Sequence, residues 1–295
     1  MLEVVSDNSS NREAKKTGDP SFHSAYILPA NEPERERLDQ QSRFMTKAVF
    51  GGKLISTQTN ISPGDEILES ATGTGIWLLD LARELPTPVS LTGIDISSRL
   101  FPTNYPSNVT FSSQSVTSLP ESWSNKFNLI NQRLLTGALT KEQWPNALSE
   151  LYRVLKPGAW IQLMETGPTP KMYSGPKMRR MVDSWASLYR LRGLVTDIQD
   201  ILEQLLSEAG FVEVKKQTVP LPLSPGREDY EEHKNNIVGF FLAAKQPFLM
   251  TGQFESETEF DEALKEMQDE WDSSSRCWWE WAVFHAKKKE KTEGM

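Results

Sequence analysis

Hydrophobic positions along the chain follow two periods, one typical of strands and one typical of helices. Short apolar runs bounded by turn residues predict strands. These runs lie at residues 65–70, 89–96, 109–116, 127–132, 160–165, 211–218 and 277–285. Apolar residues three or four positions apart predict helices before Gly51, over residues 76–85 and 144–155, and before Gly210. Strands that alternate with helices predict an α/β fold with a doubly wound, mostly parallel sheet.

Two further helical segments interrupt this alternation, at about residues 172–192 and 228–271. We expect both to be insertions within a single domain over residues 21–289. Residues 1–20 are polar and predict a disordered tail, and residues 290–295 predict a frayed end.

Composition and charge narrow the possible partners. The 295 residues carry 32 Lys and Arg against 40 Asp and Glu, a formal charge of −8. This balance argues against nucleic acid, which needs a basic face. The single cysteine and three widely spaced histidines form no metal-ligand pattern, so we expect no metal. No signal-peptide pattern and no apolar run of about 20 residues occur, so we expect a cytoplasmic protein without membrane contact.

The stretch EILESATGTGIWLLD, residues 66–80, is the most informative for chemistry. Its pattern is a strand, a glycine-containing turn and a helix that starts directly after the turn. Gly73 and Gly75 let the backbone turn tightly and let a ligand approach it. The first N–H groups of the helix are free to bind polar ligand groups. Asp95 closes the next predicted strand, where a carboxylate accepts hydrogen bonds from both hydroxyls of a ribose.

Two cofactor classes use this arrangement. A dinucleotide site needs a small third residue in GxGxxG, because the helix must pack closely on the strand. Leu78 occupies that position, which disfavours a nicotinamide-dependent oxidoreductase. S-adenosylmethionine has no pyrophosphate and tolerates a bulky residue there, so the pattern favours this cofactor.

Four stretches add a family resemblance that covers residues from about 26 to 289. They are YILPANEPERERLDQQ, ILESATGTGIWLLDLA, the pair FNLINQRLL and LSELYRVLKPGAWIQLMET, and the final strand ending FHAKKK. On these motifs the chain resembles class I S-adenosylmethionine-dependent methyltransferases. More narrowly, it resembles the fungal secondary-metabolism methyltransferases of the LaeA-like group. The resemblance implies a Rossmann-like methyltransferase fold with an N-terminal lid.

The resemblance also implies site residues. Cofactor contacts are expected from Tyr26 in the lid and from Glu69, Ala71, Gly73, Thr74, Gly75, Asp95, Ile96, Ser115, Val116 and Gln132. Arg133 and Glu165 are the expected catalytic residues, and His23, Tyr26 and His233 are further candidates for a base. Two positions depart from the family pattern: Ala71 replaces a loop glycine, and Ser115 replaces an aspartate that contacts the adenine.

The expected function is methyl transfer from S-adenosylmethionine to an O, N or S atom of a small-molecule secondary metabolite. Such an in-line displacement mainly requires that the acceptor is aligned and water excluded. The alternative is a LaeA-like regulatory protein that acts through protein partners. A third hypothesis, a cofactor-binding protein that has lost methyl transfer, rests on Ala71 and Ser115. We expect the inserted helices to lie near the acceptor pocket.

Overall fold

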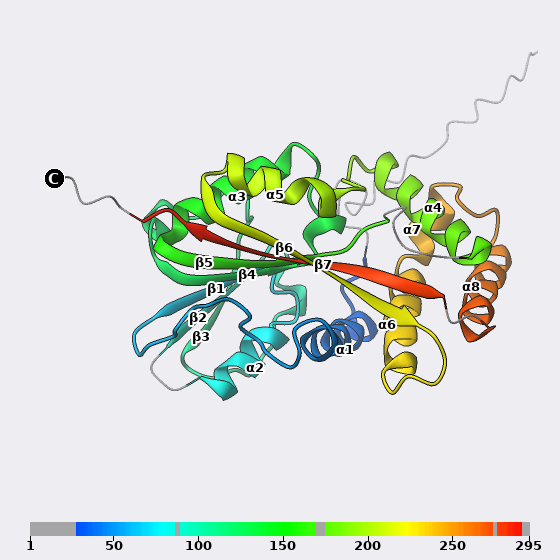
Figure 1. Ribbon diagram of the computed structural model, residues 1–295, viewed down its shortest axis with the longest axis horizontal. Helices are drawn as coiled ribbons and strands as arrows, with labels where there is room; N and C mark the ends of the chain where they lie inside the picture. The colour runs from blue at the N-terminus through cyan, green and yellow to red at the C-terminus, as the bar shows by residue number, and fades with distance from the viewer. Residues whose placement is uncertain (1–27, 86–88, 169–174, 274–275, 291–295) are drawn as a thin grey trace, which may run out of the picture.

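A seven-stranded sheet runs through the molecule in the order β3-β2-β1-β4-β5-β7-β6 (Figure 1). Its strands are β1 (Glu66–Ser70), β2 (Ser90–Asp95), β3 (Val109–Ser113), β4 (Phe127–Arg133), β5 (Leu155–Glu165), β6 (Phe211–Leu223) and β7 (Cys277–Lys288). The helices are α1 (Glu32–Ala48), α2 (Ile76–Glu84), α3 (Gln143–Val154), α4 (Pro176–Leu191), α5 (Ile198–Glu208), α6 (Tyr230–Ala243), α7 (Lys245–Met250) and α8 (Glu257–Ser273).

The structure is a computed structural model that describes residues 28–85, 89–168, 175–273 and 276–290. The predicted tail over residues 1–20, His23 and the predicted lid residue Tyr26 lie outside these ranges. Within them, no helix is long and apolar enough to cross a membrane.

Strand direction confirms the predicted doubly wound, mostly parallel sheet. Strands β3, β2, β1, β4 and β5 are parallel, and β7 pairs antiparallel with both β5 and β6. The strand order reverses between β1 and β4. At such a point the loops leaving the carboxyl ends diverge, which leaves a crevice for a ligand.

The two faces of the sheet pack against different helices because successive side chains of a strand point to opposite faces. On β1, Ile67 packs in a cluster with Trp77 of α2. Its neighbour Leu68 packs on the other face with Leu148 of α3 and Leu202 of α5. Figure 1 accordingly shows α3 and α5 above the sheet and α1 and α2 below it.

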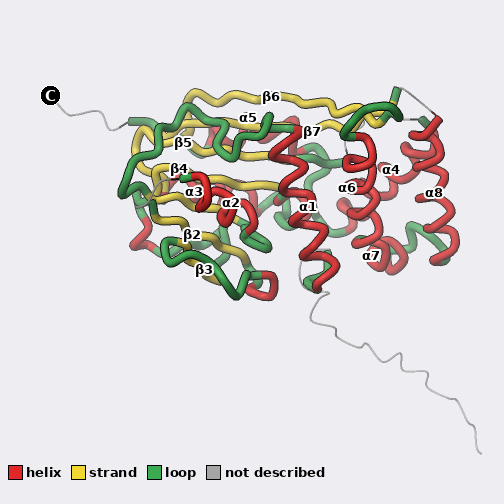
Figure 2. The backbone as a smooth tube through the Cα atoms, turned by 90° about the horizontal axis from the view of Figure 1, so that it is seen from below, coloured by secondary structure: helices red, strands yellow, loops and turns green. Residues whose placement is uncertain are grey.

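Strands β6 and β7 extend beyond the carboxyl end of β5. Residues 282–287 of β7 pair with β5, whereas residues 277–281 pair with β6 alone. This extension brings Trp279 and Trp281 into a hydrophobic cluster with α4, α6, α7 and α8. These helices gather at one end of the sheet (Figures 1 and 2).

The bounds of β3 and β5 differ from those predicted. Strand β3 ends at Ser113, so Ser115 and Val116 follow the strand. Strand β5 begins at Leu155 rather than at residue 160, because Leu155 pairs with Phe127 across a register shift in the ladder. A register shift accommodates the turn at residues 157–158, which the sequence pattern placed outside the strand.

Two other differences concern the C-terminal half. Strand β6 continues to Leu223 through Pro220 and Pro222. It lies at the sheet edge, where proline is tolerated because no further strand needs its N–H group. The predicted helical segment over residues 228–271 forms three helices, α6, α7 and α8.

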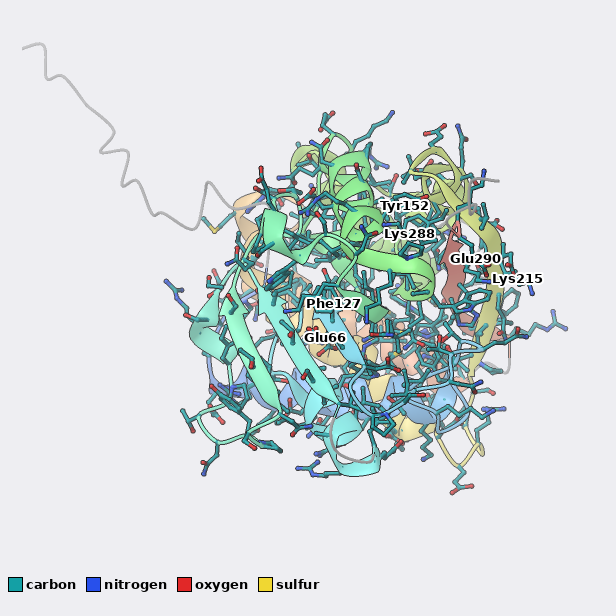
Figure 3. The ribbon with its side chains drawn as sticks, turned by 90° about the vertical axis from the view of Figure 1, so that its left-hand side faces the viewer. Glu66, Phe127, Tyr152, Lys215, Lys288 and Glu290 are labelled. Carbon is teal, nitrogen blue, oxygen red and sulfur yellow. The ribbon has the colours of Figure 1, made fainter. Side chains whose placement is uncertain are left out.

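Lys288 anchors the end of β7 at the opposite end of the sheet, which faces the viewer in Figure 3. Its Nζ donates to Asn125 Oδ1 and to the Leu155 carbonyl oxygen, both at 2.8 Å, and to the Arg153 carbonyl oxygen at 3.2 Å. The same Nζ lies 4.8 Å from the ring centroid of Tyr152. Lys288 therefore fixes the strand that carries the tryptophans at its other end.

Gly93 on β2 provides the space for the bulky Leu78. A Cβ at Gly93 would lie 2.8 Å from Leu78 Cδ1 and 2.8 Å from the Phe111 ring. We expect Gly93→Ala to lower the free energy of unfolding by about 1–3 kcal/mol, because it overpacks this contact. Urea unfolding measures the change. The control is Gly167→Ala, because a Cβ at Gly167 would lie no closer than 3.4 Å to a neighbouring atom. Equal urea midpoints for the two variants would contradict the explanation.

Candidate functional site

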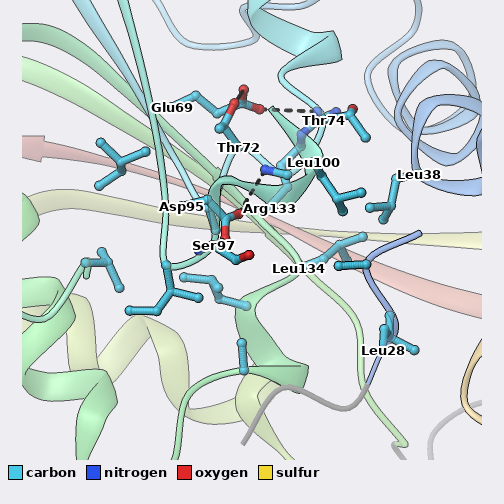
Figure 4. Close-up of a pocket in the computed structure, with 18 of the residues that line it drawn as sticks. Leu28, Leu38, Glu69, Thr72, Thr74, Asp95, Ser97, Leu100, Arg133 and Leu134 are labelled. Carbon is cyan, nitrogen blue, oxygen red and sulfur yellow. Dashed lines mark hydrogen bonds and ion pairs between the residues drawn. The ribbon is translucent and has the colours of Figure 1, made fainter. Parts of the chain in front are cut away.

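A cavity of about 950 Å³ opens at the carboxyl ends of β1, β2 and β4, where the strand order reverses. We call it the cofactor cavity. Its lining includes nine of the predicted site residues: Glu69, Ala71, Gly73, Thr74, Asp95, Ile96, Ser115, Val116 and Arg133. Figure 4 shows Asp95 and Arg133 among these residues, with Leu28, Leu38 and Leu134 toward one side. The motif residues thus converge although they come from four separate segments.

The loop after β1 contains three residues with left-handed backbone. These are Ala71 with φ 54°, Gly73 with φ 55° and Gly75 with φ 75°. Gly75 is required sterically, because a Cβ there would lie 2.5 Å from the Phe111 ring. A left-handed conformation costs an L-residue about 1–2 kcal/mol. The alanine that replaces the family's first loop glycine therefore bears backbone strain.

Asp95 connects the loop after β1 with the loop after β2. Its Oδ2 accepts the N–H of Gly73 at 3.0 Å, and its Oδ1 accepts the N–H of Ser97 at 3.1 Å. Burial raises the pKa of Asp95, and these N–H groups oppose that rise. Each carboxylate oxygen has a second lone pair. Two acceptor positions therefore remain for a ligand with neighbouring hydroxyls.

Glu69 and Arg133 form a buried ion pair in the cavity wall, with 3.4 Å between Oε1 and Nη2. Glu69 also accepts from Thr72 Oγ1 at 2.5 Å and from Asn131 Nδ2 at 3.3 Å. Arg133 donates to Ser42 Oγ of α1 at 3.0 Å. Burial raises the pKa of Glu69 to about 7, and it lowers the pKa of Arg133. The cavity therefore presents one acidic and one basic group side by side.

Glu165 lies behind the wall of the cofactor cavity and is not part of its lining. Its two oxygens accept the N–H groups of Leu135 and Thr136, each at 3.0 Å. Glu165 shares a strand face with Ile161 and Leu163, which pack in the cluster with α3 and α5. Strand alternation thus directs this carboxylate away from the cavity. Glu165 therefore holds the loop after β4 through these two N–H groups, and its catalytic role stays a prediction.

Glu165 should make stability depend on pH. Burial raises its pKa to about 8, from an ordinary value of 4.5. Between pH 4.5 and about pH 8 the folded chain therefore keeps this proton, whereas the unfolded chain has released it. The resulting stabilisation is complete below pH 4.5 and is lost as the pH rises to about 8. Between pH 6 and pH 8 the free energy of unfolding should fall in the unchanged protein. In Glu165→Gln we expect this fall to be smaller by roughly 2 kcal/mol.

Chemical denaturation at both pH values measures this difference. The comparison within each variant cancels the constant cost of replacing a hydrogen-bonded carboxylate by an amide. Parallel changes in both proteins contradict a buried protonated Glu165.

Gln132 and Gly75 also lie outside the lining of the cofactor cavity. Gln132 is buried on the α3 side of β4, and its Oε1 accepts from Ser70 Oγ at 3.2 Å. Strand alternation separates it from its neighbour Arg133. Gly75 acts indirectly, as the residue before the first turn of α2. The structure therefore does not bring the predicted cofactor contact of Gln132 into the cavity.

A second cavity of about 90 Å³ adjoins the first. It shares the lining residues Leu28, Leu38, Gln41 and Leu134 with the cofactor cavity. The rest of its lining comes from Arg37, Thr136, Gly137, Thr166, Trp185, Tyr189, Asn236, Ile237, Phe240, Trp279 and Trp281. We call it the aromatic cavity. It draws on α4 and α6, which belong to the two predicted insertions. Sequence reasoning missed Arg37, Gln41 and Leu134, although the first two lie in the N-terminal motif.

The described histidines line neither cavity. His233 is 1% exposed and stacks on Phe44, with ring centroids 5.1 Å apart. Burial lowers its pKa to about 4. His285 lies on β7 with its Nε2 2.7 Å from Ser56 Oγ. His233 is therefore a neutral packing residue, and the prediction that it is a base has no geometric support.

Comparison with known proteins adds the family context. A family model described as a methyltransferase domain matches residues 67–158. The N-methyltransferase sirN of Leptosphaeria maculans is 39% identical over 144 residues, covering 48% of this chain and 50% of the relative. The N-methyltransferase tcpN of Claviceps purpurea is 30% identical over 214 residues, covering 68% and 74%.

The secondary metabolism regulator laeA of Aspergillus fumigatus is 29% identical over 229 residues, covering 74% of this chain and 58% of the relative. The chain thus spans about half the length of sirN and laeA. A structure of Haemonchus contortus phosphoethanolamine N-methyltransferase 2 with S-adenosyl-L-methionine matches with a TM-score of 0.52 and 15% identity. This match covers 85% of this chain and 53% of the other. It shows a shared fold.

Proposed function

We propose that this chain, which belongs to the class I S-adenosylmethionine-dependent methyltransferases of the LaeA-like group, methylates an O, N or S atom of a small-molecule secondary metabolite. The observation that carries the proposal is the Asp95 carboxylate, which braces the glycine-containing loop and keeps two acceptor positions toward the cofactor cavity.

The residues of the cofactor cavity fit the chemistry of S-adenosylmethionine. Asp95 would accept hydrogen bonds from the two ribose hydroxyls. Glu69 and Arg133 would face the ammonium and carboxylate groups of the amino-acid part, because each offers the opposite charge. Ile96 is 68% exposed and offers an apolar surface for the adenine. Ser115, whose Oγ lies 2.8 Å from Thr117 Oγ1, would offer the adenine a hydroxyl. The family pattern has an aspartate carboxylate at this position.

When bound, S-adenosylmethionine would supply a methyl group on a sulfonium sulfur. An acceptor lone pair would form the new bond to carbon, sulfur would keep the electrons of the broken bond, and the acceptor's proton would finally be released to bulk solvent. The chain's part is to orient the acceptor and exclude water. Leu28, Leu38 and Leu134 supply the apolar wall between the two cavities. Among the described residues, no carboxylate or imidazole lines the aromatic cavity. We therefore assign the described part of the aromatic cavity a positioning role.

Metabolite profiling of a strain that lacks the gene tests this function. We expect a precursor that lacks one methyl group to accumulate, and the purified protein to methylate that precursor with S-adenosylmethionine. Unchanged metabolites, together with no methyl transfer to any fraction of the deletion-strain extract, contradict the proposal.

A regulatory role is the second candidate, because the similarity to laeA extends over 74% of this chain. In that case, deletion changes the transcripts of many biosynthetic genes and no single demethylated precursor accumulates. Stable protein partners in a co-purification, without methyl transfer to small molecules, favour this candidate.

A further inference from the structure

We propose that the aromatic cavity is the acceptor subsite and that it selects a neutral, planar ring bearing a carbonyl oxygen. The inference rests on the proposed function, since it assigns the substrate class of the same site. Its position supports it: Leu134 lines both cavities and directly follows Arg133 of the cofactor cavity. A ligand in the aromatic cavity would therefore lie next to a bound cofactor.

Leu134 is held in an unusual backbone conformation, with φ 60° and ψ 41°. Its N–H donates to the carbonyl oxygen of Met164 at 2.9 Å. A left-handed residue other than glycine stores strain, and such residues concentrate at functional sites. The conformation fixes Leu134 at the junction of the two cavities.

The shape of the aromatic cavity fits a flat ring. Trp185 and Trp279 are stacked, with ring centroids 5.5 Å apart and an angle of 16° between their planes. Phe240 approaches Trp185 with a centroid distance of 5.0 Å. Ring faces of this kind favour a planar ligand. A cavity of roughly 150 Å³ holds one benzene, so about 90 Å³ takes part of a ring molecule. Its reacting atom would remain at the shared wall.

The charge of the lining favours a neutral ligand. Arg37 is the one charged residue in this lining among the described residues. Its Nε and Nη2 donate to the two oxygens of Glu34, each at 2.7 Å. The guanidinium charge is therefore already balanced. A charged ligand would be buried without a counter-charge, which is unfavourable.

The unpartnered polar atoms indicate a hydrogen-bond acceptor on the ligand. Four buried nitrogens of the lining have no partner among the described residues: Arg37 Nη1, Trp185 Nε1, Asn236 Nδ2 and Trp281 Nε1. All four are donors. Asn236 Oδ1 accepts from Gln41 Nε2 at 3.1 Å, and this bond orients the amide so that Nδ2 remains free. A carbonyl oxygen supplies the acceptor that such donors require.

Two probes that differ by one carbonyl group test the selection. Calorimetry first establishes that S-adenosylhomocysteine binds. Oxindole, which has the carbonyl, and indoline, which lacks it, are then titrated into the saturated protein. We expect oxindole to bind about 10-fold more tightly, the contribution of one hydrogen bond. Asn236→Leu should lower this ratio, because it removes one of the four donors. Asn235→Leu, at an exposed position of the same helix, should leave it unchanged.

A second readout is independent of how well the Asn236 variant folds. The indole N–H resonances of Trp185 and Trp281, assigned with Trp→Phe variants, should shift further at saturation with oxindole than at saturation with indoline. Equal affinities of the probes, no oxindole binding, or a ratio unchanged in Asn236→Leu overturn the inference. Failure of S-adenosylhomocysteine to bind instead overturns the proposed function, so the two failures are distinguishable.

Discussion

Replacing Asp95 with alanine should weaken the binding of S-adenosylmethionine by about 100-fold or more while the fold is retained. A hydrogen bond to a charged group contributes about 1.5–3 kcal/mol, and both ribose hydroxyls would lose such a bond together. The variant also removes the acceptor for the N–H groups of Gly73 and Ser97. The loop that cradles the cofactor would therefore lose its brace.

Equilibrium dialysis with labelled cofactor measures this loss, and thermal unfolding checks that the variant still folds. Asp95→Asn keeps the size but places an amide against one of the two N–H groups, so an intermediate loss is expected. Glu84→Ala, at an exposed position on α2, is the control and should bind as the unchanged protein does. An affinity of Asp95→Ala within a few-fold of that control contradicts the ribose assignment.

Replacing Glu69 with alanine should lower the free energy of unfolding by about 3 kcal/mol. The change leaves Arg133 buried with no counter-charge, and breaking such a pair typically costs 3–5 kcal/mol. The lower end applies because burial already raises the pKa of Glu69 to about 7, so the carboxylate is partly protonated at neutral pH. Cofactor affinity should fall as well, since the ammonium group loses its partner.

The double variant Glu69→Ala with Arg133→Met measures the interaction energy between the two side chains. It removes both charges and should therefore be less destabilised than the sum of the single variants. Urea unfolding of the four proteins gives the interaction energy. Strict additivity means that the two groups do not interact and contradicts the buried pair.

Local patterns in the sequence were sufficient for the sheet and much of the cofactor cavity. The glycine-containing loop follows one predicted strand and Asp95 closes the next, and carboxyl ends of parallel strands meet at one edge. The family suggested by these motifs is confirmed by the match to tcpN. The role of Tyr26 as a lid residue stays a prediction.

Other features depend on contacts that local patterns do not contain. Glu165 ends a strand as predicted, but its carboxylate accepts the backbone N–H of Leu135 and lies outside the lining of the cofactor cavity. The aromatic cavity forms because residues 277–281 extend past β5, a matter of strand register. Its link from Gln41 to Asn236 joins residues 195 positions apart. The strain at Leu134 likewise has no sequence signal, since leucine is not a typical left-handed residue.

Calorimetric titration of the folded chain with S-adenosylmethionine shows whether the chain binds this cofactor. We expect one cofactor bound per chain, with saturation well below millimolar concentration. No binding at millimolar cofactor, by protein that unfolds cooperatively, would contradict it.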